Sequence, residues 1–226
     1  MTGVLGGTFD PIHVGHIAAA DAAQRALNLE RIVLVPSRIP PHRTDPATAS
    51  AEDRLEMARL AAADRPGWSA SRIELDREGP SFTYDTLVAL GQSGPALNER
   101  NPAHGAEFRE SKGTQLFFIT GADAFAEIAT WSRYPAVLDL AHFVVVSRPG
   151  ITLDSLRDRV PSAFNRQSSA RGSQPAAKTR VILVEANTPD VSSTDIRRRV
   201  RAGDSLSGLV PDSVADYIRT RRLYGK

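Results

Sequence analysis

The sequence predicts an α/β protein built on a doubly wound parallel sheet. Short apolar runs alternate with segments whose apolar residues recur at helical spacing, which is typical of parallel sheets with right-handed crossovers. The run HFVVVS at 142–147 is almost entirely apolar, as expected for a strand that helices cover on both faces. Two glycines directly follow the first predicted strand, at the carboxyl end where such sheets bind ligands.

Local composition and periodicity predict the individual elements. Runs rich in β-branched and aromatic residues predict strands over 2–5, 31–36, 68–75, 115–120, 142–147 and 180–184. Segments with helical spacing predict helices over 17–27, 52–63, 83–91, 194–202 and 211–220. The chain therefore alternates between strand and helix for most of its length.

The 226 residues suit one domain spanning 1–226. Residues 92–114 are rich in Gly, Pro, Asn, Glu and Ser and predict a flexible insertion, and 165–178 predict a mobile loop. The absence of cysteine excludes a disulfide, a thiolate metal site and a cysteine nucleophile. No apolar run is long enough to cross a bilayer and no signal-peptide pattern is present, so we expect a cytoplasmic protein without a membrane partner.

The net charge of +2 gives no strong case for a nucleic-acid partner. Basic residues gather near the carboxyl terminus, at 197–201 and 219–222. They could serve an interface between copies of the chain, so a homo-oligomer is an open alternative.

The segment GGTFDPIHVGH at 6–16 joins the first predicted strand to the first predicted helix. Glycines let the backbone approach a ligand closely, and a helix start offers unpaired N–H groups to a phosphate. His13 and His16 can add imidazole donors there. A plain turn with a capping histidine is the alternative. Neither a G-x-x-x-x-G-K-[ST] loop nor a G-x-G-x-x-G fingerprint is found at this strand.

The segment SSTDIR at 192–197 is the second strong motif. Its Ser and Thr residues can cap a helix, and Arg197 offers a planar fork of donors one turn later. Such a set can hold nucleotide phosphates, whereas the alternative is a simple helix cap with a surface arginine. Gly121 and Asp123 follow the strand QLFFIT, and Arg148 follows HFVVVS, so all these residues are expected at the same edge of the sheet.

The HxGH element at 13–16, preceded by GGTFDPI, resembles the nucleotidyltransferase superfamily, and the SSTxIR-like segment agrees with it. The longer string GGTFDPIHVGH is similar to that of bacterial nicotinate mononucleotide adenylyltransferases. The resemblance implies a Rossmann-like nucleotidyltransferase fold in which His13, His16 and Arg197 are catalytic. The ATP site that it implies contains Gly7, Thr8, Phe9, His13, His16, Gly121, Asp123, Ser193, Thr194 and Arg197.

Three further features of the sequence resemble the family's mononucleotide site and imply which second substrate is bound. PPHR at 40–43 resembles a family loop near the mononucleotide phosphate, and SFTYDTL at 81–87 resembles the family's SYTxxTL segment, with Phe82 in place of the common Tyr. Trp131 resembles a tryptophan that stacks on the pyridine ring, although an ordinary core aromatic is the alternative. The mononucleotide site implied in this way contains His42, Arg43, Thr83, Tyr84, Trp131 and Arg148.

The function implied is adenylyl transfer from ATP to nicotinate mononucleotide in NAD biosynthesis. Mg²⁺ is expected to be carried by ATP, with no metal bound by the protein alone. The alternatives are a nicotinamide mononucleotide or phosphopantetheine adenylyltransferase, or a non-catalytic nucleotide sensor. A helix start near Thr83 favours a carboxylate over a neutral amide, which supports nicotinate as the acceptor.

Overall fold

The computed structural model describes residues 1–40, 46–92, 115–147, 152–164 and 181–225. Two 3₁₀ helices cover Ile128–Thr130 and Ala136–Asp139. The strands and α-helices are β1 (Thr2–Gly7), α1 (Val14–Leu27), β2 (Arg31–Pro36), α2 (Ala51–Ala63), β3 (Trp68–Ala70), α3 (Thr83–Gln92), β4 (Leu116–Gly121), α4 (Ala122–Ala126), β5 (His142–Ser147), α5 (Leu153–Arg159), α6 (Pro161–Phe164), β6 (Val181–Glu185), α7 (Ser193–Ala202) and α8 (Asp212–Thr220).

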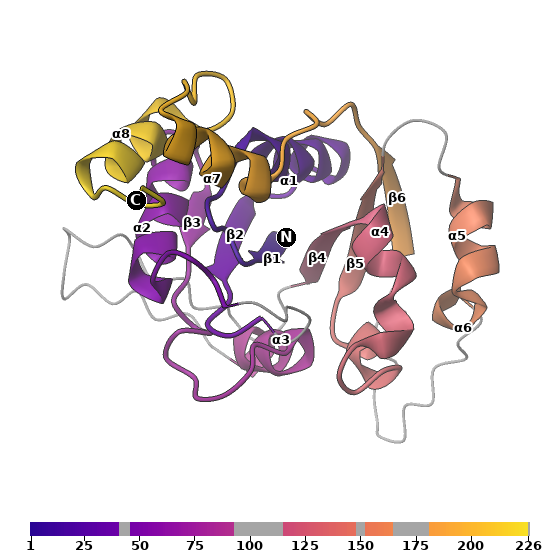
Figure 1. Ribbon diagram of the computed structural model, residues 1–226. Helices are drawn as coiled ribbons and strands as arrows, with labels where there is room; N and C mark the ends of the chain where they lie inside the picture. Colours follow the sequence, from indigo (N-terminus) through magenta and orange to yellow (C-terminus); the bar gives the residue numbers. More distant parts are fainter. Residues whose placement is uncertain (41–45, 93–114, 148–151, 165–180, 226) are drawn as a thin grey trace.

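The strands form one parallel sheet in the order β3-β2-β1-β4-β5-β6 (Figure 1). The chain builds outward from β1 to β3 and then returns past β1 to build β4, β5 and β6 in the opposite direction. This reversal between β1 and β4 confirms the predicted doubly wound sheet. It also creates the switch point at which α/β sheets bind ligands, beyond the carboxyl ends of the strands.

Helices cover both faces of the sheet (Figure 1). Successive residues of a strand point to opposite faces, so each central strand contributes to two cores. Leu5 and Leu34 belong to a core that also contains residues of α1, α2, α7 and α8. Val4 and Val33 belong to the other core, with residues of α3, α4 and α5. This double coverage explains why β4 and β5 are almost continuously apolar.

The prediction of a strand over 68–75 was wrong beyond Ala70. The N–H of Ser71 still donates to Leu34 in β2, but the N–H groups of Leu75 and Asp76 both donate to the carbonyl of Arg72 and close a turn. The chain therefore leaves the edge of the sheet early. The short helices α4 and α6 were not predicted, because segments of five and four residues are too short for a helical period to show.

The predicted loop at 165–178 lies outside the described residues, as does the predicted insertion at 92–114 apart from Gln92. The single domain over 1–226 therefore stays a prediction. Within the described ranges, no helix is both long and apolar enough to span a membrane.

Candidate active site

A cavity of about 720 Å³ opens at the carboxyl ends of β1 and β4. This volume lies in the range of cofactor and small-molecule sites, about 300–1,000 Å³. The cavity lining includes residues of both the predicted ATP site and the predicted mononucleotide site, namely Gly7, Thr8, His13, His16, Thr83, Gly121, Asp123 and Trp131. The lining does not include five other predicted site residues, namely Phe9, Tyr84, Ser193, Thr194 and Arg197. His42, Arg43 and Arg148 lie outside the described residues, so their roles stay predictions.

Close contacts shape the turn after β1. A methyl group on Gly7 would lie 2.7 Å from Cε1 of Phe9, so only glycine fits there without a shift. Phe9 itself adopts a left-handed backbone with φ of 51°, and its ring is buried. That ring meets His16 edge-on, with 5.1 Å between the centroids. The Phe9 side chain therefore packs against the His16 imidazole, and the predicted role of Phe9 in the ATP site stays a prediction.

The two histidines stand at the start of α1. Their rings stack with 3.7 Å between centroids, and the backbone N–H of His13 donates to Nδ1 of His16 at 3.3 Å. Because Nδ1 accepts, the neutral His16 ring carries its proton on Nε2. Burial lowers the pKa of His13 to about 4, and burial together with His13 lowers the pKa of His16 well below its usual value. Both imidazoles are therefore neutral N–H donors at pH 7.

The lowered pKa values predict a loss of stability in acid. The unfolded histidines titrate near pH 6.5, so between pH 6.5 and 4 the unfolded chain binds more protons than the folded chain. The stabilisation is present above pH 6.5 and disappears as the pH falls toward 4. For His13 alone it amounts to roughly 3 kcal/mol. Urea unfolding from pH 7.5 to 4.5 checks this, and His13→Gln should flatten the dependence. An equal slope in both proteins would contradict the assignment.

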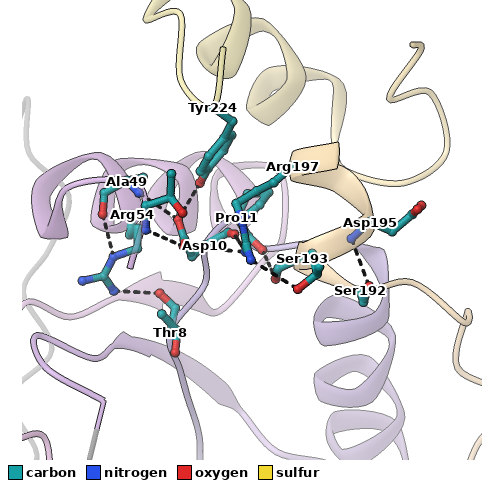
Figure 2. A network of polar contacts seen from close by, with 12 residues as sticks. Thr8, Asp10, Pro11, Ala49, Arg54, Ser192, Ser193, Asp195, Arg197 and Tyr224 are labelled. Carbon is teal, nitrogen blue, oxygen red and sulfur yellow. Dashed lines mark hydrogen bonds and ion pairs between the residues drawn. The ribbon is translucent and has the colours of Figure 1, made fainter. Parts of the chain in front are cut away.

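The motifs at 6–16 and 192–197 are in contact with each other (Figure 2). Ser192 caps α7 by accepting from the N–H of Asp195 at 3.1 Å. Ser193 Oγ donates to the carbonyl of Pro11 at 2.9 Å, and Arg197 Nη1 donates to the carbonyl of Asp10 at 2.7 Å. The α7 start is thus attached to the turn that follows β1. Contact of Ser193, Thr194 and Arg197 with a triphosphate stays a prediction.

The part of the cavity that is predicted to hold the mononucleotide is lined by residues of α3 and of the segment after α4. Trp131 lines the cavity and packs edge-on against Phe118 at 5.8 Å, so the same ring is both a core contact and a wall. The first hydrogen bond of α3 runs from the N–H of Thr86 to Phe82, which leaves the N–H groups of residues 83–85 without intrahelical partners. The Arg133 guanidinium lies 4.9 Å from the Tyr84 ring centre and adds positive charge near this helix start.

Sequence reasoning missed Glu74, which lines the same cavity and is 6% exposed. Its carboxyl accepts from the Thr86 hydroxyl at 2.5 Å, and burial raises its pKa although the Thr86 and Ser81 hydroxyls act in the opposite direction. Glu74 thereby attaches the turn after β3 to α3. The available signal was a single acidic residue inside the strand predicted over 68–75.

Sequence reasoning also missed Arg54, whose side chain is buried beside the turn that follows β1. Its Nη1 donates to the carbonyl of Thr8 at 2.7 Å (Figure 2). The same Nη1 donates to the carbonyl of Ser37 at 2.6 Å. Arg54 therefore connects the ends of β1 and β2 at the site. An arginine on the apolar face of the predicted helix 52–63 was the signal that pointed to a buried role.

Comparison with known proteins shows the family to which the chain belongs. The cytidylyltransferase-like family model matches residues 4–199. The chain is 40% identical to the "probable nicotinate-nucleotide adenylyltransferase" of Moorella thermoacetica, over 98% of this chain and 90% of that protein. It is also 40% identical to the protein of the same name in Roseiflexus sp., over 98% and 96%.

A solved structure of the Plasmodium falciparum nicotinic acid mononucleotide adenylyltransferase, complexed with NaAD, shares the fold. Its TM-score is 0.67 at 17% identity, and the match covers 99% of this chain and 96% of that one. The fold, the matched family model and the identity along nearly the whole chain lead to one conclusion. The chain belongs to the cytidylyltransferase-like family and, within it, to the nicotinate-nucleotide adenylyltransferases.

Proposed function

We propose that the protein transfers the adenylyl group of ATP to nicotinate mononucleotide, forming nicotinate adenine dinucleotide and pyrophosphate in NAD biosynthesis. One observation carries the proposal: a single cavity contains the paired histidines at the β1 turn and, across it, Trp131 with the α3 start. The first set offers donors to phosphates, and the second offers an aromatic face and N–H groups to a pyridine carboxylate. The activity for which the relatives are named supports the same reaction.

In the proposed step, an oxygen of the mononucleotide phosphate attacks the α-phosphorus of ATP. The bond from this phosphorus to the bridging oxygen breaks, and pyrophosphate leaves with the electron pair. The attacking phosphate is already anionic near neutral pH, so the step needs no general base. His13 and His16 donate N–H groups to the α- and β-phosphoryl oxygens, where preorganised donors stabilise the charge of the transition state. The turn and the α3 start hold the two substrates in line.

Mg²⁺ is part of the proposed substrate, because ATP binds it through its phosphate oxygens and the ion screens their charge. The N–H donors around the β1 turn suit phosphate oxygens, so the ion would be held by the nucleotide itself. In the part of the chain that the structure describes, no three His, Cys, Asp or Glu side chains gather into a metal-binding group. The cytoplasmic location, the lack of a nucleic-acid partner and the homo-oligomer stay predictions from the sequence.

A steady-state assay of pyrophosphate release tests the function. ATP is supplied with nicotinate mononucleotide, nicotinamide mononucleotide or phosphopantetheine in turn. We expect turnover to be highest with the nicotinate acceptor. ATP binding without turnover on any acceptor would support a nucleotide sensor, and faster turnover on another acceptor would reassign the substrate.

Arg197→Lys is expected to raise the KM for ATP and to leave the KM for the mononucleotide nearly unchanged. Lysine keeps the charge but lacks the planar fork through which Arg197 contacts Asp10 and Thr194. Arg201, on the same helix and exposed, provides the matched control as Arg201→Lys. A change confined to the mononucleotide KM would contradict the assignment of Arg197 to the ATP side.

A further inference from the structure

The turn between β1 and α1 contains a buried carboxylate, that of Asp10 (Figure 2). Asp10 is 1% exposed. Its Oδ2 accepts from the N–H of Thr48 at 2.8 Å, and its Oδ1 accepts from the N–H of Ala49 at 3.0 Å. The hydroxyl of Tyr224 donates to the same Oδ1 at 3.0 Å. Because a buried carboxylate is costly unless its oxygens are paired, these donors decide where the Asp10 side chain lies.

Asp10 also contacts Arg197, through both its backbone carbonyl and its carboxylate. Arg197 Nη1 donates to the Asp10 carbonyl and lies 3.6 Å from Oδ2, and the Arg197 side chain is 11% exposed. The position of the guanidinium therefore depends on the position of the carboxylate. The phosphate-binding turn, the start of α2, α7 and the carboxyl-terminal segment all meet at this one side chain.

Tyr224 is held in this place against its backbone preference. Its φ is 64°, in the left-handed region that non-glycine residues rarely adopt, and the residue is 6% exposed. Such a conformation persists only where the surroundings impose it. Burial and the neighbouring Asp10 raise the pKa of the Tyr224 phenol, so the hydroxyl is protonated and can donate near neutral pH.

We propose that Tyr224 is a positioning residue for ATP binding: it holds the Asp10 carboxylate in place, and Asp10 in turn orients Arg197 and the turn before α1. Tyr224 touches no substrate in this arrangement and acts only through Asp10. The inference rests on the proposed function, because it assigns the β1 turn and Arg197 to the triphosphate. A purely structural tyrosine would stabilise the fold without affecting one substrate more than the other.

The chain contains a matched control in Tyr217 on α8. Its hydroxyl donates to Oδ1 of Asp53 at 3.0 Å, which is the same chemistry at the same distance. Asp53 belongs to α2, and neither residue of this pair lines the cavity. Tyr217→Phe therefore removes a comparable hydrogen bond from the same end of the chain without touching Asp10.

The test compares Tyr224→Phe with Tyr217→Phe. Titration calorimetry measures ATP affinity, and steady-state kinetics measure the KM of each substrate. Tyr224→Phe should weaken ATP binding by about 3- to 10-fold and leave the KM for the mononucleotide within about twofold, since coupling through a neighbour has this size. Tyr217→Phe should leave both values unchanged. Equal ATP affinity in the two variants would overturn the inference.

A double-mutant cycle with Arg197→Lys tests the route through Asp10. In the Arg197→Lys background, Tyr224→Phe should change ATP affinity by a smaller factor than in the unmodified protein, because the part of its effect that acts through Arg197 has already been lost. Fully additive effects would overturn the proposed route. Measurements on the unmodified protein separate the two proposals. If the unmodified protein failed to bind ATP, the proposed function would be contradicted. If it bound ATP and turned over normally and Tyr224→Phe had the same ATP affinity, only the positioning role would be contradicted.

Discussion

Replacing His16 with alanine is expected to lower kcat by about 10²- to 10³-fold, the typical cost of one donor aimed at developing charge. The affinity for ATP should change much less, because the Nε2–H contact strengthens as negative charge moves onto the phosphoryl oxygens. The structure supports this role in two ways. His16 lines the cavity, and the N–H of His13 occupies its Nδ1, so a single N–H remains to be donated. Single-turnover kinetics and ATP titration measure the two effects separately.

His16→Gln distinguishes a hydrogen-bond donor from an acid or base. Glutamine keeps a neutral N–H donor, so it should recover part of the lost kcat, and the low pKa of His16 agrees with a neutral donor. His13→Ala should weaken ATP binding as well, because its donor is expected to meet phosphate in the ground state. His142, at the amino end of β5, provides a control outside the cavity wall. Turnover near that of the unmodified protein in His16→Ala would remove His16 from the mechanism.

Nicotinate mononucleotide should be used with a kcat/KM between about tenfold and 10³-fold higher than nicotinamide mononucleotide. A carboxylate at a helix start gains roughly 0.3–2 kcal/mol from the helix dipole, and each charge-assisted hydrogen bond adds about 1.5–3 kcal/mol. Each ~1.4 kcal/mol corresponds to a factor of ten. The Arg133 cation over Tyr84 acts in the same direction. Equal kcat/KM for both acceptors would contradict nicotinate as the preferred substrate.

Three variants identify the source of that preference. Tyr84→Pro removes the backbone N–H and the ring, whereas Tyr84→Ala removes only the ring and its contact with Arg133. The additional loss in Tyr84→Pro should therefore fall mainly on the acid acceptor. Trp131→Ala should weaken both acceptors to a similar extent, because stacking does not distinguish an acid from an amide. A Tyr84→Pro variant that lost the two acceptors equally would place the discrimination elsewhere.

Local sequence was sufficient to predict most of the sheet and to single out the motifs at 6–16 and 192–197. The strands at 31–36 and 142–147 have the predicted bounds, because β-branched apolar runs favour extended structure and both lie inside the covered sheet. The first motif could be predicted because glycine, a helix start and two imidazoles lie within eleven residues. The order in which strands and helices alternate was also enough to predict a ligand site at the switch point.

Only the tertiary structure decided which distant residues support that site. Glu74 faces the cavity because β3 ends at Ala70 and the following turn folds inward, which no local period indicates. Arg197 reaches Asp10 across 187 positions of sequence, and Tyr224 reaches the same carboxylate across 214. A sequence pattern reports which residues share a helix or a strand. The partners of a buried charge depend instead on how those elements pack. A buried carboxylate needs hydrogen-bond donors, and tertiary packing decides which residues lie close enough to donate.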